Sequence, residues 1–136
     1  NNNCKIYGVE PTGANSMAQS IKVGKPVTLN SIETIADSLA PPMALPFSYA
    51  VCKKFVDEFV AVTDDQICAG LSLLQEEGKL AVEPAAGAVV AGAIWPLRKE
   101  LAGKRIGLVI CGANIDAQTY ERCLRQGSRT INEELL

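Results

Sequence analysis

Two carboxylates and one thiol stand at the ends of apolar runs, where each run stops at a short polar turn. Glu10 and Glu83 both occur in the tripeptide Val-Glu-Pro, and Cys111 begins the tetrapeptide Cys-Gly-Ala-Asn. Each turn is followed by helix-like sequence. Open α/β sheets bind ligands at the carboxyl ends of strands, in turns of this kind. The sequence therefore predicts that these three side chains lie around a ligand site.

Each Val-Glu-Pro turn allows two interpretations. Proline presets the first helical residue and the Glu lies beside the positive end of the helix dipole, so each Glu could simply cap its own helix. The repetition of the turn supports a ligand role equally well. A carboxylate with nearby carbonyl oxygens also suits a hard cation, and Glu10, the Ala14 carbonyl and Ser16 form a sparse candidate set.

The Cys111 turn also allows two interpretations. Free cysteines are often buried as structural side chains, but a neutral thiol at this place can also form a weak hydrogen bond to a ligand. No base or cation stands beside Cys111 in the sequence, so nothing predicts an activated nucleophile. Gly112 permits a positive φ or a close backbone approach.

Composition limits the classes of protein that remain. A chain of 136 residues with 48% hydrophobic and 21% charged residues suits one globular domain. The net charge of -2 gives no reason to expect nucleic acid or an anionic membrane as a partner. The longest apolar run, residues 85–96, is too short to span a bilayer.

Cysteine usage indicates a reducing compartment, and we expect a cytoplasmic protein. The five cysteines include no Cys-x-x-Cys pair, and the chain has no histidine. This composition argues against a zinc site and excludes a Ser-His or Cys-His nucleophile within the chain.

Apolar periodicity and turn residues predict an alternation of strands and helices. Thr63 and Gln66 predict a capping box, Asp116 an N-cap, Pro96 a kink and Gly127 a helix end. The expected strands are 5–9, 59–62, 80–82 and 106–110, and the expected helices are 15–22, 32–39, 46–56, 64–77, 85–101 and 117–126. These elements predict an α/β fold, an open and mostly parallel sheet with helices on both faces in three layers. We expect one domain over residues 1–127 and a loose tail over 128–136.

Five motifs in order resemble one enzyme family. They are Lys-Ile-Tyr-Gly-Val-Glu-Pro (5–11), Glu-Thr-Ile-Ala-Asp (33–37), Val-Ala-Val-Thr-Asp-Asp-Gln-Ile (60–67), Ala-Val-Glu-Pro-Ala-Ala-Gly (81–87) and Val-Ile-Cys-Gly-Ala-Asn (109–114). The series resembles the carboxyl-terminal half of the fold-type II pyridoxal-phosphate enzymes, in the threonine/serine dehydratase and serine racemase group. The resemblance covers residues 5–127 and implies part of the large domain of such an enzyme.

The resemblance implies roles for single residues around pyridoxal phosphate. Cys111 falls where the family places a Ser or Cys that hydrogen-bonds the pyridine nitrogen, and a neutral partner there suits α,β-elimination of water from a hydroxy-amino acid. Gly112 would line the ring, and Glu83 matches a carboxylate near the cofactor pocket. Residues 34–37 match a segment that flanks the ring, but the family continues with Gly where this chain has Ser38.

A divalent cation is a weaker implication of the same resemblance. Some members of the family bind one through a carboxylate, a backbone carbonyl and a further acid. Glu10 and Ala14 match the first two positions, whereas the third falls on Ser16, which is not an acid. We therefore do not expect a metal to be bound there.

The family's cofactor lysine and phosphate-binding loop would lie upstream of the matched region. Lys22 follows a weak helix without the family's neighbouring Arg, and we interpret it as a solvated lysine. The chain alone is thus expected to hold no catalytic residue and to be part of a threonine/serine dehydratase. The alternatives are a serine racemase-type isomerase and a stand-alone binding module derived from such an enzyme. We expect either a homo-oligomer or association with the missing half.

Overall fold

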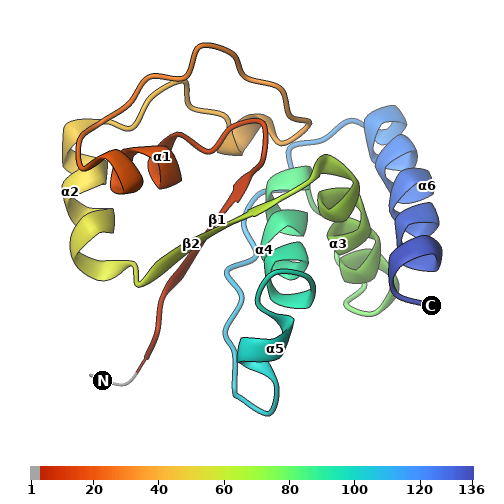
Figure 1. Cartoon of the computed structure of the whole chain (residues 1–136). Coiled ribbons are helices and arrows are strands. Elements are labelled where there is room, and N and C mark those ends of the chain that lie inside the picture. Colours follow the sequence, from red (N-terminus) through yellow and green to blue (C-terminus); the bar gives the residue numbers. More distant parts are fainter. Residues whose placement is uncertain (1–3) are drawn as a thin grey trace.

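The computed structural model describes residues 4–136 and has a small parallel sheet surrounded by helices (Figure 1). The elements in chain order are β1 (Tyr7–Pro11), α1 (Ser16–Val23), the 3-10 turn η1 (Asp37–Leu39), α2 (Pro46–Phe55), β2 (Glu58–Val62), α3 (Asp64–Glu76), α4 (Pro84–Ile94), α5 (Arg98–Leu101) and α6 (Ala117–Glu134). β1 pairs in parallel with β2, from Tyr7 opposite Glu58 to Pro11 opposite Val62.

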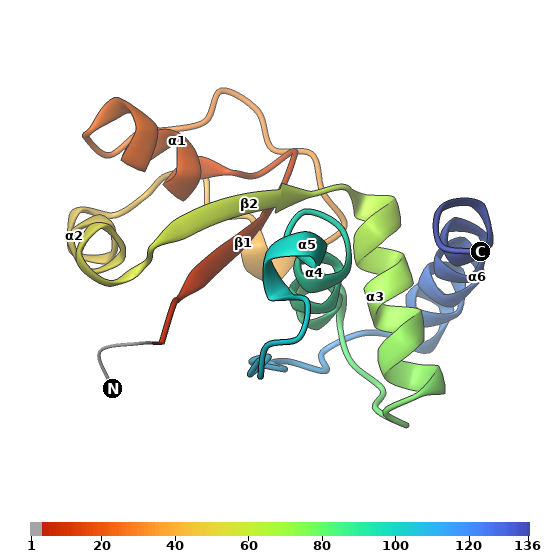
Figure 2. The same cartoon turned by 60° about the horizontal axis from the view of Figure 1, so that its bottom comes forward.

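Helices lie on both sides of the two strands. Figures 1 and 2 show α1 and α2 on one side, and α3, α4 and α6 on the other. This arrangement confirms the α/β class and the parallel pairing expected from the sequence. The first three residues of the expected domain lie outside the described residues.

Local signals placed several helix boundaries correctly. The Thr63 hydroxyl accepts a hydrogen bond from the backbone amide of Gln66, and the side-chain carbonyl of Gln66 accepts one from the backbone amide of Thr63. These two bonds form the predicted capping box of α3. Asp116 caps α6 by accepting from the Thr119 amide at 2.9 Å. The predicted long helix is interrupted around Pro96, with α4 before the break and α5 after it.

Two of the four expected strands are wrong for this chain. Residues 80–82 and 106–110 form no ladder within the part that the structure describes. A strand requires a neighbour along its length, whereas the backbone hydrogen bond that links these two regions, from the Glu83 amide to the Gly112 carbonyl, lies beyond the ends of both runs. As a result Ile106, Leu108 and Val109 are 51%, 40% and 76% exposed.

In place of the helix expected over residues 32–39, the structure has only the 3-10 turn η1, because backbone amides of this region donate to other groups. The Ile35 amide donates to Asp64 Oδ2 at 3.0 Å and the Ala36 amide donates to Thr34 Oγ1 at 3.2 Å, so neither donates to the carbonyl four residues earlier. The Glu33 amide, which would have no partner within such a helix, donates to the Gly13 carbonyl at 3.1 Å. The segment 33–38 is therefore fixed in an irregular conformation by residues from elsewhere in the chain.

The expectation that the last helix ends at Gly127 is also wrong. α6 continues to Glu134, so residues 128–134 are helical and not a loose tail. A Cβ atom at Gly127 would lie 2.2 Å from the Cys68 carbonyl oxygen and 2.2 Å from Ser72 Oγ. This glycine serves a close contact between α6 and α3. The domain limit at residue 127 stays a prediction.

The core sits between α3 and its neighbours. One buried cluster joins Ala36, Val62, Ile67, Ala88 and Ala91, and a second joins Cys68, Leu71, Val82, Ala86 and Cys123. Glycines again allow the approach, because a Cβ at Gly70 would lie 2.1 Å from the Gly87 carbonyl oxygen. Within residues 4–136, no helix has the length and apolar character needed to cross a membrane.

Candidate functional site

Glu83 joins three segments that are far apart in the sequence. It is the N-cap residue of α4 and only 9% of it is exposed. Its Oε1 accepts a hydrogen bond from Ser38 Oγ at 2.7 Å, and its Oε2 accepts one from the Asn114 amide at 3.2 Å. Its own amide donates to the Gly112 carbonyl oxygen at 3.2 Å. The structure thus brings Glu83, Ser38 and Gly112 together, and their role around a cofactor stays a prediction.

Gly112 adopts a conformation that other residues rarely take. Its φ is +78°, and a Cβ atom there would lie 2.3 Å from Glu83 Oε1. Both the positive φ and the close approach considered from the sequence are therefore present. A side chain at this position would push away the buried carboxylate.

Cys111 is exposed, which contradicts the alternative of a buried structural thiol. The run before it forms no ladder with any of the described residues, 4–136, and is itself largely exposed. Its neighbour Gly112 contacts Glu83, so Cys111 is next in sequence to a residue of the cluster. The hydrogen bond of this thiol to a cofactor nitrogen stays a prediction.

Glu10 does not share the role of Glu83, although both stand in the same tripeptide. Its Oε1 accepts from the Met17 amide at 2.9 Å and its Oε2 from the Ala18 amide at 2.8 Å, both in the first turn of α1. Burial raises the pKa of Glu10, and the two backbone hydrogen bonds oppose this shift. This geometry supports the helix-capping interpretation for the first Val-Glu-Pro turn.

The two carboxylate oxygens of Glu10 are thus occupied by helix donors. Ala14 is fully buried, and its amide donates to the Pro11 carbonyl at 3.0 Å. Residues 4–136 contain no group of three or more His, Cys, Asp or Glu side chains suited to a metal ion. The sequence-based expectation that Glu10 and Ala14 hold no metal stays a prediction.

Asp64 is the residue near this site that sequence reasoning missed. Its Oδ1 accepts from Thr34 Oγ1 at 2.7 Å and its Oδ2 from the Ile35 amide at 3.0 Å. The sequence indicated only that Asp64 belongs to the start of α3. Its position directly after β2, at the carboxyl end of a strand, was a signal that it faces the same edge as the other site residues.

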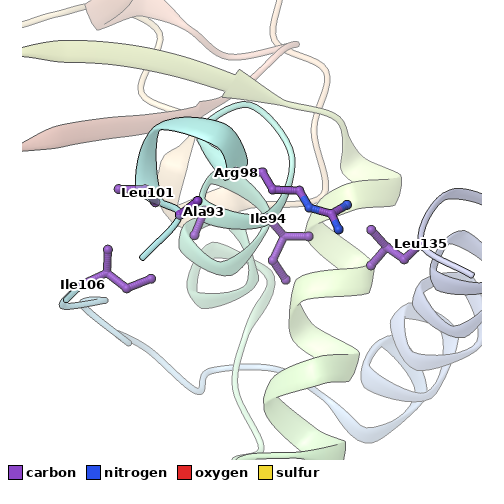
Figure 3. Close-up of a pocket in the computed structure, with 7 residues that line it drawn as sticks. Ala93, Ile94, Arg98, Leu101, Ile106 and Leu135 are labelled. Carbon is purple, nitrogen blue, oxygen red and sulfur yellow. The ribbon is translucent and has the colours of Figure 1, made fainter. Parts of the chain in front are cut away.

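An open, largely apolar pocket of about 410 Å³ lies elsewhere, between α4, α5 and the end of α6 (Figure 3). Its lining residues are Ala93, Ile94, Arg98, Leu101, Ala102, Ile106 and Leu135. Figure 3 shows the Arg98 side chain reaching toward Ile94 and Leu135. This pocket contains none of the predicted site residues, so we do not assign the ligand site to it.

The chain is an α/β protein with a parallel pair of strands, in which Glu83 brings Ser38, Gly112 and Asn114 into one cluster. The family model for pyridoxal-phosphate dependent enzymes matches residues 1–112. The chain belongs to this family.

Individual relatives agree with the family assignment. Phenylserine dehydratase of Ralstonia pickettii is 44% identical over 124 residues, which cover 91% of this chain and 38% of that protein. Serine racemase of Schizosaccharomyces pombe is 32% identical over 124 residues, with 91% and 38% covered. The chain therefore spans about two fifths of the length of these relatives.

Solved structures give the same result for the fold. The processed form of threonine deaminase isoform 2 from Solanum lycopersicum has a TM-score of 0.84 at 29% identity, covering 92% of this chain and 37% of that one. Maize serine racemase has a TM-score of 0.80 at 31% identity, with 93% and 41% covered. The fold is that of the fold-type II enzymes.

Proposed function

We propose that this chain is the carboxyl-terminal part of the large domain of a pyridoxal-phosphate-dependent dehydratase, an ammonia-lyase that eliminates water from a hydroxy-amino acid. The observation that carries the proposal is the Glu83 cluster, which gathers Ser38, Gly112 and Asn114, with the exposed Cys111 next to Gly112 in sequence. The relationship to a phenylserine dehydratase and to an L-threo-3-hydroxyaspartate ammonia-lyase of Saccharomyces cerevisiae supports this choice of reaction.

The residues of the cluster suit a flat, aromatic cofactor. Gly112 presents backbone without a side chain, and the exposed Cys111 thiol beside it is a neutral hydrogen-bond partner for a ring nitrogen. When bound, pyridoxal phosphate withdraws electrons from the α-carbon of an amino acid. A neutral thiol leaves the ring nitrogen without a proton, which moderates this withdrawal and suits elimination of a β-hydroxyl group.

Glu83 has a supporting role in this proposal. The Ser38 hydroxyl and the Asn114 backbone amide each donate to one of its two oxygens, so the carboxylate is fixed and its negative charge is partly compensated. Fixed in this way, it sets the position of Gly112 and of the adjacent thiol. The cofactor lysine and the phosphate-binding loop would come from the rest of the domain.

Two observations favour alternatives to a dehydratase acting within one polypeptide. The similarity to serine racemases from fission yeast and maize supports a serine racemase-type isomerase as the second candidate. The exposed apolar side chains of residues 106–110 support association, either with the rest of the domain or with a second copy, and are the feature that a stand-alone binding module would use.

The free thiols of all five cysteines support a reducing compartment such as the cytoplasm.

A hybrid enzyme tests the proposal. The matched part of the Ralstonia pickettii phenylserine dehydratase is replaced by this chain, which is 44% identical to it over 124 residues. We expect the hybrid to bind pyridoxal phosphate and to release ammonia from phenylserine, threonine or serine. Racemisation of serine without ammonia release would favour the isomerase.

Substitutions at Cys111 then test its role in the hybrid. Cys111→Ser is expected to keep appreciable activity because a hydroxyl can serve the same nitrogen, whereas Cys111→Asp is expected to change the cofactor absorption spectrum. Cys4 is also an exposed thiol, so Cys4→Ser and Cys4→Asp are matched controls. Unchanged spectra and rates in both Cys111 variants would refute the assignment.

A further inference from the structure

Two carboxylates at the starts of neighbouring helices hold the same segment. Asp64 is the first residue of α3 and holds Thr34 and Ile35, while Glu83 is the N-cap residue of α4 and holds Ser38. We call this pair of carboxylates the clamp. It fixes both ends of the segment 34–38, the part of the chain that resembles the family's ring-flanking segment.

We propose that Asp64 is a positioning residue for the cofactor site, acting on Glu83 through the segment 34–38. This inference rests on the proposed function. The hydrogen bonds found for the Asp64 carboxylate go to Thr34 and Ile35, so its two acceptor atoms are both used by the segment. By fixing where the segment starts, it sets where Ser38 Oγ meets Glu83 Oε1.

The packing of the segment explains why it can transmit a displacement. Ala36, midway along it, is 1% exposed and belongs to the core cluster that includes Ala88 and Ala91 of α4. The Ala36 amide also donates to Thr34 Oγ1 at 3.2 Å, which links the Asp64 contact to the buried centre. The other residues of the segment are half-buried (Thr34) or exposed (Ile35, Asp37 and Ser38), so a shift at Thr34 reaches Ser38 along the backbone on either side of the buried Ala36.

The neighbouring Asp65 provides a matched control. Both aspartates lie in the first turn of α3, so both carboxylates interact favourably with the helix dipole. Asp65 accepts a hydrogen bond from Gln126 Nε2 at 3.0 Å and does not hold the segment. A role in capping α3 predicts similar effects at the two positions, whereas a positioning role predicts an effect at Asp64 alone.

Hydrogen exchange on the 136-residue chain measures the clamp directly. Asp64→Asn leaves a single acceptor oxygen for two donors, so we expect the Ile35 amide to exchange about tenfold faster or more. If the segment transmits the change to Glu83, the Asn114 amide also exchanges faster, because it donates to Glu83 Oε2. The amide of Leu71, a fully buried residue of α3, reports global unfolding as an internal reference.

A second variant leaves α3 untouched. Thr34→Val removes the hydroxyl that donates to Asp64 and is expected to accelerate exchange of the Asn114 amide in the same way. Asp65→Asn is expected to leave that amide unchanged relative to Leu71. The proposal is overturned if Asp64→Asn and Thr34→Val affect the Asn114 amide no more than Asp65→Asn does.

The hybrid enzyme supplies a second readout and separates the two proposals. There, Asp64→Asn is expected to shift the absorption spectrum of bound pyridoxal phosphate and to lower kcat more than it raises KM, whereas Asp65→Asn is not. A spectrum that responds equally to both variants also overturns the positioning role. Failure of the unsubstituted hybrid to bind the cofactor counts against the proposed function alone, because the exchange measurements do not depend on the cofactor.

Discussion

Replacing Gly127 by Ala tests the close packing of α6 on α3. A glycine that ended a helix would carry a positive φ and alanine would be strained there, but Gly127 is not among the glycines with positive φ, so this source of strain does not apply. In the structure, Gly127 is buried inside α6, and a Cβ there would lie 2.2 Å from the carbonyl oxygen of Cys68. That oxygen belongs to the backbone of α3, so it cannot rotate away.

The size of the effect follows from these opposing contributions. Overpacking of a close contact costs about 1–3 kcal/mol. Because the new Cβ would meet the rigid backbone of α3, we expect Gly127→Ala to fall in the upper part of that range. Subtracting the gain in helix propensity leaves a net loss of about 1–2 kcal/mol in the free energy of unfolding. We expect the substitution to separate α6 from α3 near Ser72, whose Oγ would also lie 2.2 Å from the new Cβ.

Urea unfolding followed by circular dichroism measures this loss. Ser128→Ala is the matched control, because Ser128 is the next residue of α6 and is exposed. The control is expected to change the free energy of unfolding by no more than about 0.5 kcal/mol, in the stabilising direction. If Gly127→Ala is as stable as the wild type or more stable, the close packing of α6 on α3 is refuted.

Two further predictions concern helix starts. Thr63→Ala should lower the free energy of unfolding by about 1 kcal/mol in urea, because both hydrogen bonds of the capping box are lost, whereas Thr63→Ser should retain most of it. For Glu10, burial raises the pKa of the folded state above its ordinary value, so the folded chain holds this proton more tightly than the unfolded chain. As pH rises from the ordinary pKa of Glu through the pKa of Glu10 in the folded chain, the wild type should therefore lose stability relative to the non-titrating Glu10→Gln variant. Urea titrations across this pH interval measure the difference in free energy of unfolding between the two proteins, and a constant difference would contradict the prediction.

Local chemistry predicted what local contacts decide. The capping box of Thr63 and Gln66, the cap at Asp116 and the interruption at Pro96 were all predictable, because each depends on residues within one or two turns. The association of Glu83 with the Gly112 segment was also predicted, although the two strands from which it was inferred, 80–82 and 106–110, form no ladder among the described residues.

Non-local contacts decided what the sequence could not predict. Residues 106–110 have strand-like composition, but a ladder depends on a neighbouring segment, and the described residues do not pair with them. Gly127 has the same identity whether it ends a helix or allows two helices to touch. Asp64 and Asp65 are the same residue type side by side, and only the fold shows that one of them holds the segment 34–38.

The uncovered run at residues 106–111 has a consequence for the solubility of the chain. Ile-Gly-Leu-Val-Ile-Cys carries no charge and no proline, a composition typical of segments that assemble into intermolecular β-structure. With Val109 76% exposed, the run is open to copies of itself at high concentration. Lys104 and Arg105 precede it directly, and their mutual repulsion between molecules opposes such stacking. Salt, which screens that repulsion, will therefore promote aggregation of the chain wherever this run is left uncovered.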